Sequence, residues 1–227
     1  MSTPHPATYN DGVLAEMQDM LPPEGLVLDP MAGVGKIGLV AQFRSVAVDL
    51  EAEWVSQAAR RSAKPVKADS TALPFSDASF AAVACSPAYG SRMADQYVPK
   101  VAPRRSDGTR MSYRLKLGRP LTANSGAAMQ WGPAYRDLHR AAAVEWLRVL
   151  RPGGTLLLNM KDHLRAWILQ PVTAWWWQML ADEGFRGPLE VRAVLAGGDQ
   201  NTSRARAKGL GTINYETVAR FERPQEG

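Results

Sequence analysis

The sequence predicts an α/β fold, built as a parallel sheet with helices on both of its faces. Short apolar runs alternate with stretches whose apolar residues recur at helical spacing, and a glycine-rich turn directly follows the first apolar run. Strands that alternate with helices require right-handed crossovers, and these crossovers place helices on both faces of a parallel sheet. Ligands of such sheets bind at the carboxyl ends of the strands.

Length and composition fit one domain of ordinary globular type. The chain has 227 residues, of which 45% are hydrophobic and 22% are charged, and these values fit a single domain over residues 1–227. No apolar stretch approaches the ~18 residues of a membrane span, and the first residues lack the features of a secretion signal. A single cysteine, Cys85, excludes a disulfide framework and a cysteine cluster for zinc. We therefore expect a cytoplasmic protein without a bound metal.

The first half of the chain contains four of the expected strands. Residues 11–21 carry apolar side chains at helical spacing, Asn10 or Asp11 can cap the start of this helix, and Pro22-Pro23 ends it. Short apolar runs then predict buried strands with helices between them. The expected elements in order are strand 25–30, a helical stretch through residue 43, strand 45–50, helix 51–63, strand 65–69 and strand 80–87.

The second half returns to this alternation after a long interruption. Residues 91–132 are rich in Arg, Gly, Ser, Pro and Asn and show no period, so we expect an inserted loop region there. Helical spacing resumes at 135–150, and Pro152-Gly153-Gly154 predicts a turn before the next strand. The remaining expected elements are strand 155–160, helix 171–183 ended by Gly184, and two closing strands at 188–196 and 214–223.

Positive charge is concentrated in the insert. The whole chain has a net charge of +5, whereas eight basic and two acidic residues between positions 91 and 119 give that segment a net charge of +6. Arginines contact phosphates and aromatic rings stack on bases, so the insert predicts DNA as a partner, with RNA as an alternative. A surface loop with solvated charges is the simpler explanation. The candidate nucleic-acid-binding residues are Arg92, Arg104, Arg105, Arg110, Arg114 and Trp131.

The glycine-rich turn after the first strand begins with an acid. Gly33 and Gly35 let the backbone turn sharply and approach a ligand closely. Such a turn can also hold the pyrophosphate of a dinucleotide, but Asp29 would repel that group and can pair with an ammonium group instead. The turn therefore favours a ligand that carries a cationic amino group.

Two further acids follow the second and third strands. Asp49 is placed to accept the hydroxyl groups of a ribose, and Asp69 is placed to hold an adenine amino group. Leu50 and Trp54 offer apolar cover for a purine ring. Helix capping by Asp49 and loop capping by Asp69 are the structural alternatives. Together these residues predict a pocket for an adenosine that carries a cationic amino acid.

Four segments resemble successive motifs of the S-adenosylmethionine-dependent nucleic-acid amino-methyltransferases: VLDPMAGVGKIGLVA, AVDLEAEWVSQAARR, ADSTALPFSDASFAAV and SPAY. The resemblance implies a class I methyltransferase fold, which is a Rossmann-like, doubly wound, mostly parallel sheet of seven strands. It implies S-adenosylmethionine as the cofactor, with the methionine part on the glycine turn. The residues that it assigns to the cofactor are His5, Ala7, Asp29, Met31, Gly33, Gly35, Asp49, Leu50, Asp69 and Ser86.

Ser86-Pro87-Ala88-Tyr89 ends the fourth strand and resembles the catalytic motif of this family, in which an Asp, Asn or Ser precedes two prolines and an aromatic residue. The exocyclic amine of a base is a poor nucleophile because its lone pair is delocalised into the ring. The Ser86 hydroxyl and the Pro87 carbonyl can accept its N–H bonds and aim the lone pair at the methyl group. Tyr89 would stack on a base flipped out of its helix. The expected catalytic residues are therefore Ser86, Pro87 and Tyr89.

The resemblance predicts a site-specific DNA methyltransferase that acts on cytosine N4 or adenine N6, similar to enzymes of phages and of restriction-modification systems. Ala88 departs from the family pattern because it replaces the second proline, and this replacement loosens the turn. Two alternatives stay open: an RNA methyltransferase, for example one acting on guanine N2 of tRNA, and a nucleic-acid-binding module without catalytic activity. A small-molecule methyltransferase is a third alternative, which the basic insert and SPAY disfavour.

Three other features have simpler explanations. Cys85 lies within the fourth strand, so we expect a buried thiol there and no nucleophile. The tryptophans at 175–177 point in different directions on a helix, which favours packing over base stacking. Asn159, Lys161 and Asp162 follow the fifth strand and are expected to border the site.

Overall fold

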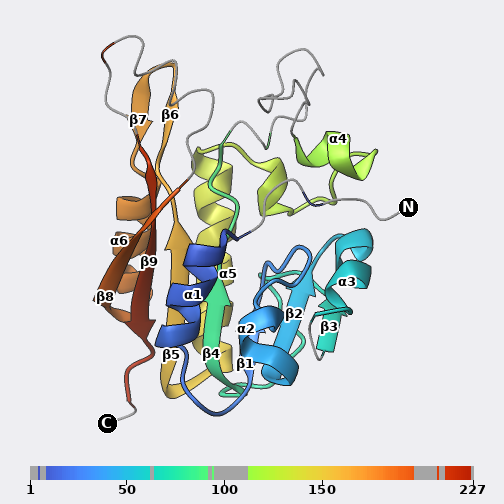
Figure 1. The fold of residues 1–227 in the computed structure, drawn as a ribbon, viewed down its shortest axis with the longest axis vertical. Helices are drawn as coiled ribbons and strands as arrows, with labels where there is room; N and C mark the ends of the chain where they lie inside the picture. The colour runs from blue at the N-terminus through green and yellow to red at the C-terminus, as the bar shows by residue number, and fades with distance from the viewer. Residues whose placement is uncertain are drawn as a thin grey trace.

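The computed structural model describes residues 5, 9–61, 64–91, 94, 112–196, 209 and 213–225. Seven strands form one sheet in the order β3-β2-β1-β4-β5-β9-β8 (Figure 1). The first five strands are parallel, whereas β9 runs antiparallel to both β5 and β8. The strands are β1 (Val27–Asp29), β2 (Ser45–Asp49), β3 (Lys64–Lys67), β4 (Phe80–Cys85), β5 (Leu150–Met160), β8 (Arg186–Leu195) and β9 (Tyr215–Glu222). The predicted doubly wound, mostly parallel seven-stranded sheet is confirmed.

Helices cover both faces of this sheet. Helices α1 and α2 lie on one side, and α5 and α6 lie on the other (Figure 1). Each predicted helix of the core is present, although its bounds differ by a few residues from the expected ones. The helices are α1 (Asp11–Met20), α2 (Gly38–Ala41), α3 (Ala52–Ala58), α4 (Tyr113–Leu117), α5 (Pro133–Val149) and α6 (Val172–Asp182), with 3-10 turns η1 (Gln42–Arg44) and η3 (Gly126–Ala128). Among the described residues, no helix is long and apolar enough to span a membrane.

The central strands are apolar on both faces, which explains their continuous hydrophobic sequences. Val83 and Cys85 of β4 face the cluster with α5 and α6, whereas Ala82 and Ala84 face the cluster with α1. Successive side chains of a strand point to opposite faces, so a strand buried on both sides needs an unbroken apolar run. The Asn10 side chain caps α1 by accepting a hydrogen bond from the Val13 N–H at 2.8 Å, as the sequence predicts.

Strand β5 is longer than the sequence predicts. It begins at Leu150 and passes through the proline and glycines of the expected turn. The pairing with β4 jumps from Phe80↔Leu150 to Ala82↔Thr155, so these residues form an irregularity within the strand. Gly153, with a φ of +72°, supplies the left-handed conformation that the irregularity requires.

A small hairpin that the sequence did not reveal precedes α6. Strands β6 (His163–Arg165) and β7 (Ile168–Gln170) pair antiparallel outside the main sheet (Figure 1). The two residues at its turn, Ala166 and Trp167, have φ values of +49° and +66°. Hairpin turns of this kind usually contain Asn or Gly, and the absence of both hid the hairpin from the sequence.

The end of the insert contains two short helical elements, so the prediction of a loop over 91–132 is wrong for Tyr113–Leu117 and Gly126–Ala128. Helix α4 begins after Ser112, whose hydroxyl accepts a hydrogen bond from the Leu115 N–H at 3.2 Å, and 3-10 turn η3 follows. Tyr113 and Leu117 of α4 pack against Trp54 of α3. This contact fixes α4 to α3, beside the strand ends where the sequence predicts a nucleotide pocket. Arg92, Arg104, Arg105 and Arg110 lie outside the described residues.

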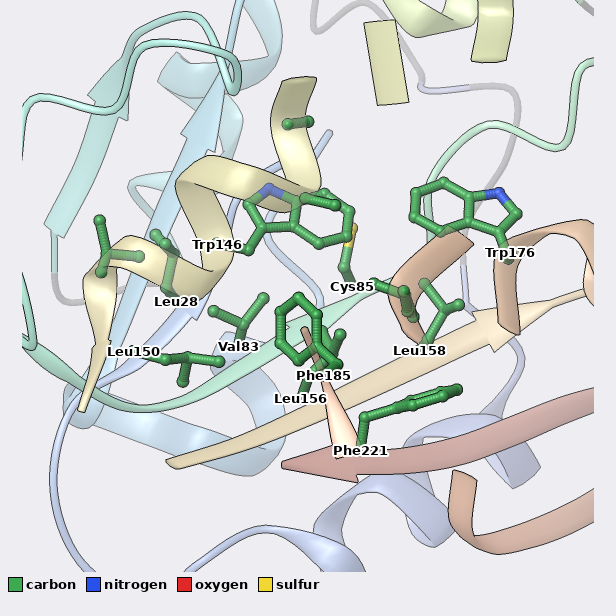
Figure 2. Packing of buried hydrophobic residues seen from close by; sticks show 14 of the residues in the cluster. Leu28, Val83, Cys85, Trp146, Leu150, Leu156, Leu158, Trp176, Phe185 and Phe221 are labelled. Atoms are coloured by element: carbon green, nitrogen blue, oxygen red, sulfur yellow. The ribbon is translucent and has the colours of Figure 1, made fainter. Parts of the chain in front are cut away.

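Two tryptophans and two phenylalanines dominate the larger core cluster. Figure 2 shows Trp146 of α5 and Trp176 of α6 above Phe185 and Phe221, with Cys85 between the layers. The rings of Trp146 and Trp176 are stacked, with centroids 5.6 Å apart and planes at 9°. The buried positions of Cys85 and Trp176 confirm that the thiol and the tryptophan run belong to the core.

We expect Phe221→Ala to lower the free energy of unfolding by about 3–5 kcal/mol, because it leaves a cavity in a fully buried cluster. Urea denaturation of the purified protein measures this change. Leu195→Ala is the control, because that side chain is 85% exposed and its truncation leaves no cavity. Equal effects of the two substitutions would contradict the packing described here.

Candidate functional site

A cavity of about 490 Å³ lies at the carboxyl ends of β1, β2, β3 and β4. The glycine turn, the ends of β2 and β4, the insert and the start of β9 all contribute to its wall. Most of the residues that the sequence assigns to cofactor and catalysis therefore meet at one place. The predicted residues in the wall are His5, Met31, Gly33, Asp49, Leu50, Asp69, Ser86, Pro87 and Tyr89.

Of the predicted cofactor residues that the structure describes, Asp29 and Gly35 do not line the cavity. Ala7 lies outside the described residues. Asp29 is only 1% exposed and lies behind the turn, where Oδ1 accepts the Met31 N–H and Oδ2 accepts the Tyr9 hydroxyl, both at 3.3 Å. Burial raises the pKa of Asp29 to about 8. Asp29 therefore stabilises the turn from the protein interior. Its side chain does not line the cavity in this structure.

The two glycines of the turn have different roles. Gly33 has a φ of +52° and lines the cavity, and a Cβ there would come within 2.9 Å of the His5 ring. Gly35 has a φ of +73°, but it faces Ala58 of α3, whose Cβ would be 2.8 Å from an added Cβ. Gly33 thus keeps the cavity open, whereas Gly35 permits the close packing of the turn on α3.

Asp49 joins the glycine turn to α3. Its Oδ2 accepts the Gly33 N–H at 2.8 Å, and its Oδ1 accepts the Glu51 N–H at 2.9 Å. Burial raises the pKa of this carboxyl to about 6. The residue that caps α3 is Glu51, so the alternative of Asp49 as the helix cap is wrong, although Asp49 does hold the capping residue. The carboxylate keeps a place in the cavity wall.

Asp69 and an aromatic wall lie beside Asp49. The Oδ1 of Asp69 accepts the N–H and the hydroxyl of Thr71 at 2.9 Å and 2.8 Å, as the loop-capping alternative expects. Its Oδ2 accepts from Asn124 of the insert at 3.3 Å, and both residues line the cavity. The ring of Trp54 lies edge-on to His5 at 4.3 Å and to Tyr113 at 5.9 Å. The insert therefore closes the apolar side of this cavity.

Ser86 and Tyr89 belong to a polar network across three strands. The Ser86 and Tyr89 hydroxyls are 3.1 Å apart, and Tyr89 donates to Glu216 Oε2 of β9 at 3.1 Å. The Asn159 Nδ2 on β5 lies 3.1, 2.8 and 2.9 Å from Ser86, Tyr89 and Glu216, and its two N–H bonds are shared among these three acceptors. Burial and the nearby Glu216 charge hold the pKa of Tyr89 well above its usual value, so its hydroxyl stays a donor.

The turn at Ala88 is held from outside the motif. The Tyr135 hydroxyl donates to the Ala88 carbonyl at 2.7 Å and accepts from Trp176 Nε1 at 3.1 Å. The Trp131 N–H donates to the Gly90 carbonyl at 2.8 Å. A buried tyrosine on α5 therefore holds the turn at Ala88.

Trp131 is half-buried and packs on the protein, and its role in base stacking stays a prediction. Its ring contacts Tyr135 and Trp175, with centroids 5.4 Å away in both cases, and the Arg136 guanidinium lies 5.4 Å from its centroid. Arg114 is exposed on α4, where a phosphate could reach it. Arg119 forms ion pairs with Glu51 and Glu53 at the start of α3, at 2.7 and 2.6 Å. This basic residue therefore holds the insert against α3.

Sequence reasoning missed Glu216 in the cavity wall. Glu216 follows the first residue of β9, and the antiparallel direction of that strand brings its start to the carboxyl ends of its neighbours. A prediction that the last strand runs antiparallel would have placed Glu216 at this edge of the sheet. Asn159 lies at the site as expected, whereas Asp162 accepts the Thr173 N–H at 2.7 Å near the start of α6.

Comparison with known proteins defines the fold. No protein-family model and no curated sequence matches the chain. A SAM-dependent methyltransferase of Methanosarcina mazei is 14% identical, with a TM-score of 0.57 over 93% of this chain and 98% of that one. Geranyl diphosphate methyltransferase in complex with SAM is 13% identical, with a TM-score of 0.54 over 92% and 84%. The [4+2]-cyclase SpnF is 15% identical, with a TM-score of 0.57 over 98% and 87%. The chain thus has the class I methyltransferase fold.

We expect Tyr135→Phe to lower the free energy of unfolding by about 1–3 kcal/mol, because it leaves the Ala88 carbonyl and the Trp176 indole N–H without their partner. Thermal and urea unfolding measure the loss. Tyr215→Phe is the matched control, since Tyr215 is 51% exposed. A Tyr135 variant as stable as the control would show that the turn does not depend on this hydroxyl.

Proposed function

We propose that this protein is an S-adenosylmethionine-dependent methyltransferase that methylates an exocyclic amine of a DNA base, cytosine N4 or adenine N6. The observation that carries the proposal is a single cavity whose wall contains both the glycine turn and Ser86-Pro87-Ala88-Tyr89. A methyl donor on the first segment and an amine on the second can then lie in line with each other. The shared fold of the methyltransferases compared above supports the cofactor.

The chemistry of the cavity wall suits this cofactor. Asp49 accepts ribose hydroxyls, Asp69 accepts the adenine amino group, and Trp54 covers the purine. Lys36, whose ammonium group donates to the Tyr9 carbonyl at 2.9 Å, offers a positive charge for the carboxylate of the methionine part. The carboxylates around the cavity favour a ligand that carries an ammonium and a sulfonium charge.

Ser86 and Pro87 act on the acceptor. The Ser86 hydroxyl and the Pro87 carbonyl accept the two N–H bonds of the amine and fix its lone pair toward the methyl group. The nitrogen attacks the methyl carbon, the bond from carbon to sulfur breaks, S-adenosylhomocysteine leaves and the nitrogen loses one proton. No covalent enzyme intermediate is involved, and burial raises the pKa of the Cys85 thiol so that it stays protonated in the core.

DNA as the substrate rests on the SPAY motif and on the basic charge of the insert. The insert reaches the cavity through Asn124 and Tyr113, so a strand bound along it would pass the site. Binding through phosphates requires that DNA affinity fall as salt rises. RNA methylation is the second candidate, because the same amine chemistry applies to both nucleic acids.

Methyl transfer to DNA is the direct test. We expect the protein to transfer labelled methyl groups from S-adenosylmethionine to DNA, with N4-methylcytosine or N6-methyladenine detected by nucleoside mass spectrometry. Ser86→Ala should lower the rate by about 100-fold or more and keep the affinity for the cofactor, because it removes one positioned acceptor. Ser79→Ala, in an exposed loop, is the control.

Methylation of tRNA and not of DNA would replace DNA by RNA in the proposal. Tight nucleic-acid binding without affinity for S-adenosylmethionine in isothermal titration would instead establish the module without catalytic activity. Cofactor binding with methyl transfer to neither nucleic acid would refute the base-methylating function.

Cofactor affinity should depend on pH through Asp49. Its pKa lies at about 6, so the ribose acceptor is ionised at pH 7.5 and mostly protonated at pH 5. We expect the Kd for S-adenosylhomocysteine to rise by about 10-fold as pH falls across this range, because a protonated carboxyl accepts the hydroxyls poorly. Asp49→Asn should bind weakly at both values. A Kd that stays constant in the unmodified protein would contradict the role of Asp49.

A further inference from the structure

Glu216 is the acid of the cavity wall that no motif assigns. It lies at the start of β9, between Tyr215 and Thr217, and the pairing of Thr217 with Met160 brings it to the carboxyl end of β5. Its side chain shares the cavity wall with Ser86 and Tyr89. Glu216 therefore belongs to the side of the cavity that holds the acceptor, across from the acids that follow β2 and β3.

The two oxygens of this carboxylate are used differently. Oε2 accepts hydrogen bonds from the Tyr89 hydroxyl at 3.1 Å and from the Asn159 amide at 2.9 Å. Oε1 has no hydrogen-bond partner among the residues that the structure describes. Two neutral donors thus fix the carboxylate by one oxygen and leave the other for a molecule in the cavity.

Glu216 also differs from several other described glutamates in its ion pairs. Within the described part of the chain, no Lys, Arg or His side chain forms an ion pair with it, whereas Glu51, Glu53, Glu145, Glu190 and Glu222 all pair with arginines. A fixed carboxylate that borders a cavity without a counter-ion attracts a cation or an N–H donor.

We infer that Glu216 is a catalytic residue on the acceptor side of the proposed methyltransferase site, where its Oε1 shares one of the two N–H bonds of the substrate amine with the Ser86 hydroxyl and takes that proton on methylation. The nitrogen forms its bond to the methyl carbon, the bond from carbon to sulfur breaks, and the surplus proton passes from nitrogen to Oε1. Tyr89 and Asn159 hold the carboxylate in place during this step. The inference rests on the proposed function and assigns a residue to the same site.

The oxygen acceptors of this subsite determine which kind of acceptor group it can bind. With Ser86 Oγ and the Pro87 carbonyl, Glu216 provides a third oxygen acceptor, so the subsite suits an amine with N–H bonds and a positive charge that develops in the transition state. An anionic acceptor would meet repulsion there.

Sinefungin tests the position of Glu216 without any substrate. This analogue carries an ammonium group where S-adenosylmethionine carries its methyl, so the group points at the acceptor subsite, whereas S-adenosylhomocysteine has nothing there. We expect Glu216→Gln to weaken sinefungin by about tenfold and S-adenosylhomocysteine by less than about twofold, as measured by isothermal titration. Glu216→Asp keeps the charge and should give an intermediate loss.

The matched control is Glu222→Gln on the same strand. Glu222 pairs with Arg186 at 2.8 Å, at the end of β9 remote from the cavity, so both ligands should bind its variant as they bind the unmodified protein. The rate of methyl transfer in a single turnover should fall about tenfold or more in Glu216→Gln, with little change in the KM for the nucleic acid.

The outcomes separate the two proposals. Equal losses of sinefungin and S-adenosylhomocysteine in Glu216→Gln, or no loss of either, would overturn the role of Glu216 and leave the proposed function intact. Failure of the unmodified protein to bind either ligand would overturn the proposed function itself. Thermal unfolding of each variant confirms that it is folded, and Glu216→Asp decides the question where the glutamine variant is unstable.

Discussion

The Asp49 carboxylate links the two segments between which the cavity forms. Its hydrogen bonds to the Gly33 and Glu51 N–H groups hold the glycine turn of one strand against the helix that follows the next strand. Both segments leave the sheet at the same edge because β1 and β2 are parallel and adjacent. Without this bridge, the turn and α3 would be joined mainly by apolar packing, such as that of Val34 on Trp54 and of Gly35 on Ala58.

The positions of the strands and of the acids at their ends could be predicted from the sequence, because both follow from local rules. An unbroken apolar run such as that of β4 has few alternatives to a strand buried on two faces, and an acid at its end must lie at the carboxyl edge. The features that escaped prediction depend on contacts between distant segments. Tyr135 supports Ala88 across 47 positions, and Glu216 reaches Tyr89 across 127, and neither pairing leaves a local pattern.

The dependence on distant contacts also explains why the sequence did not predict helix α4. Helix α4 is only five residues long and gains its stability from the contact of Tyr113 with Trp54, so propensity alone could not reveal it. The proteins with the same fold include methyltransferases and a cyclase, which shows that the sheet does not determine the reaction. Function must then be argued from the groups that the loops and the last strand bring to the cavity.

The place of β9 within the sheet has a consequence for biosynthesis. This strand is the last of the described strands in sequence order, yet it lies between β5 and β8, and β8 has no other described neighbour in the main sheet. A nascent chain therefore exposes the open edges of β5 and β8 until β9 has left the ribosome. Glu216 cannot accept its hydrogen bonds from Tyr89 and Asn159 over the same interval. The polar network around Ser86 is therefore completed only when β9 joins the sheet.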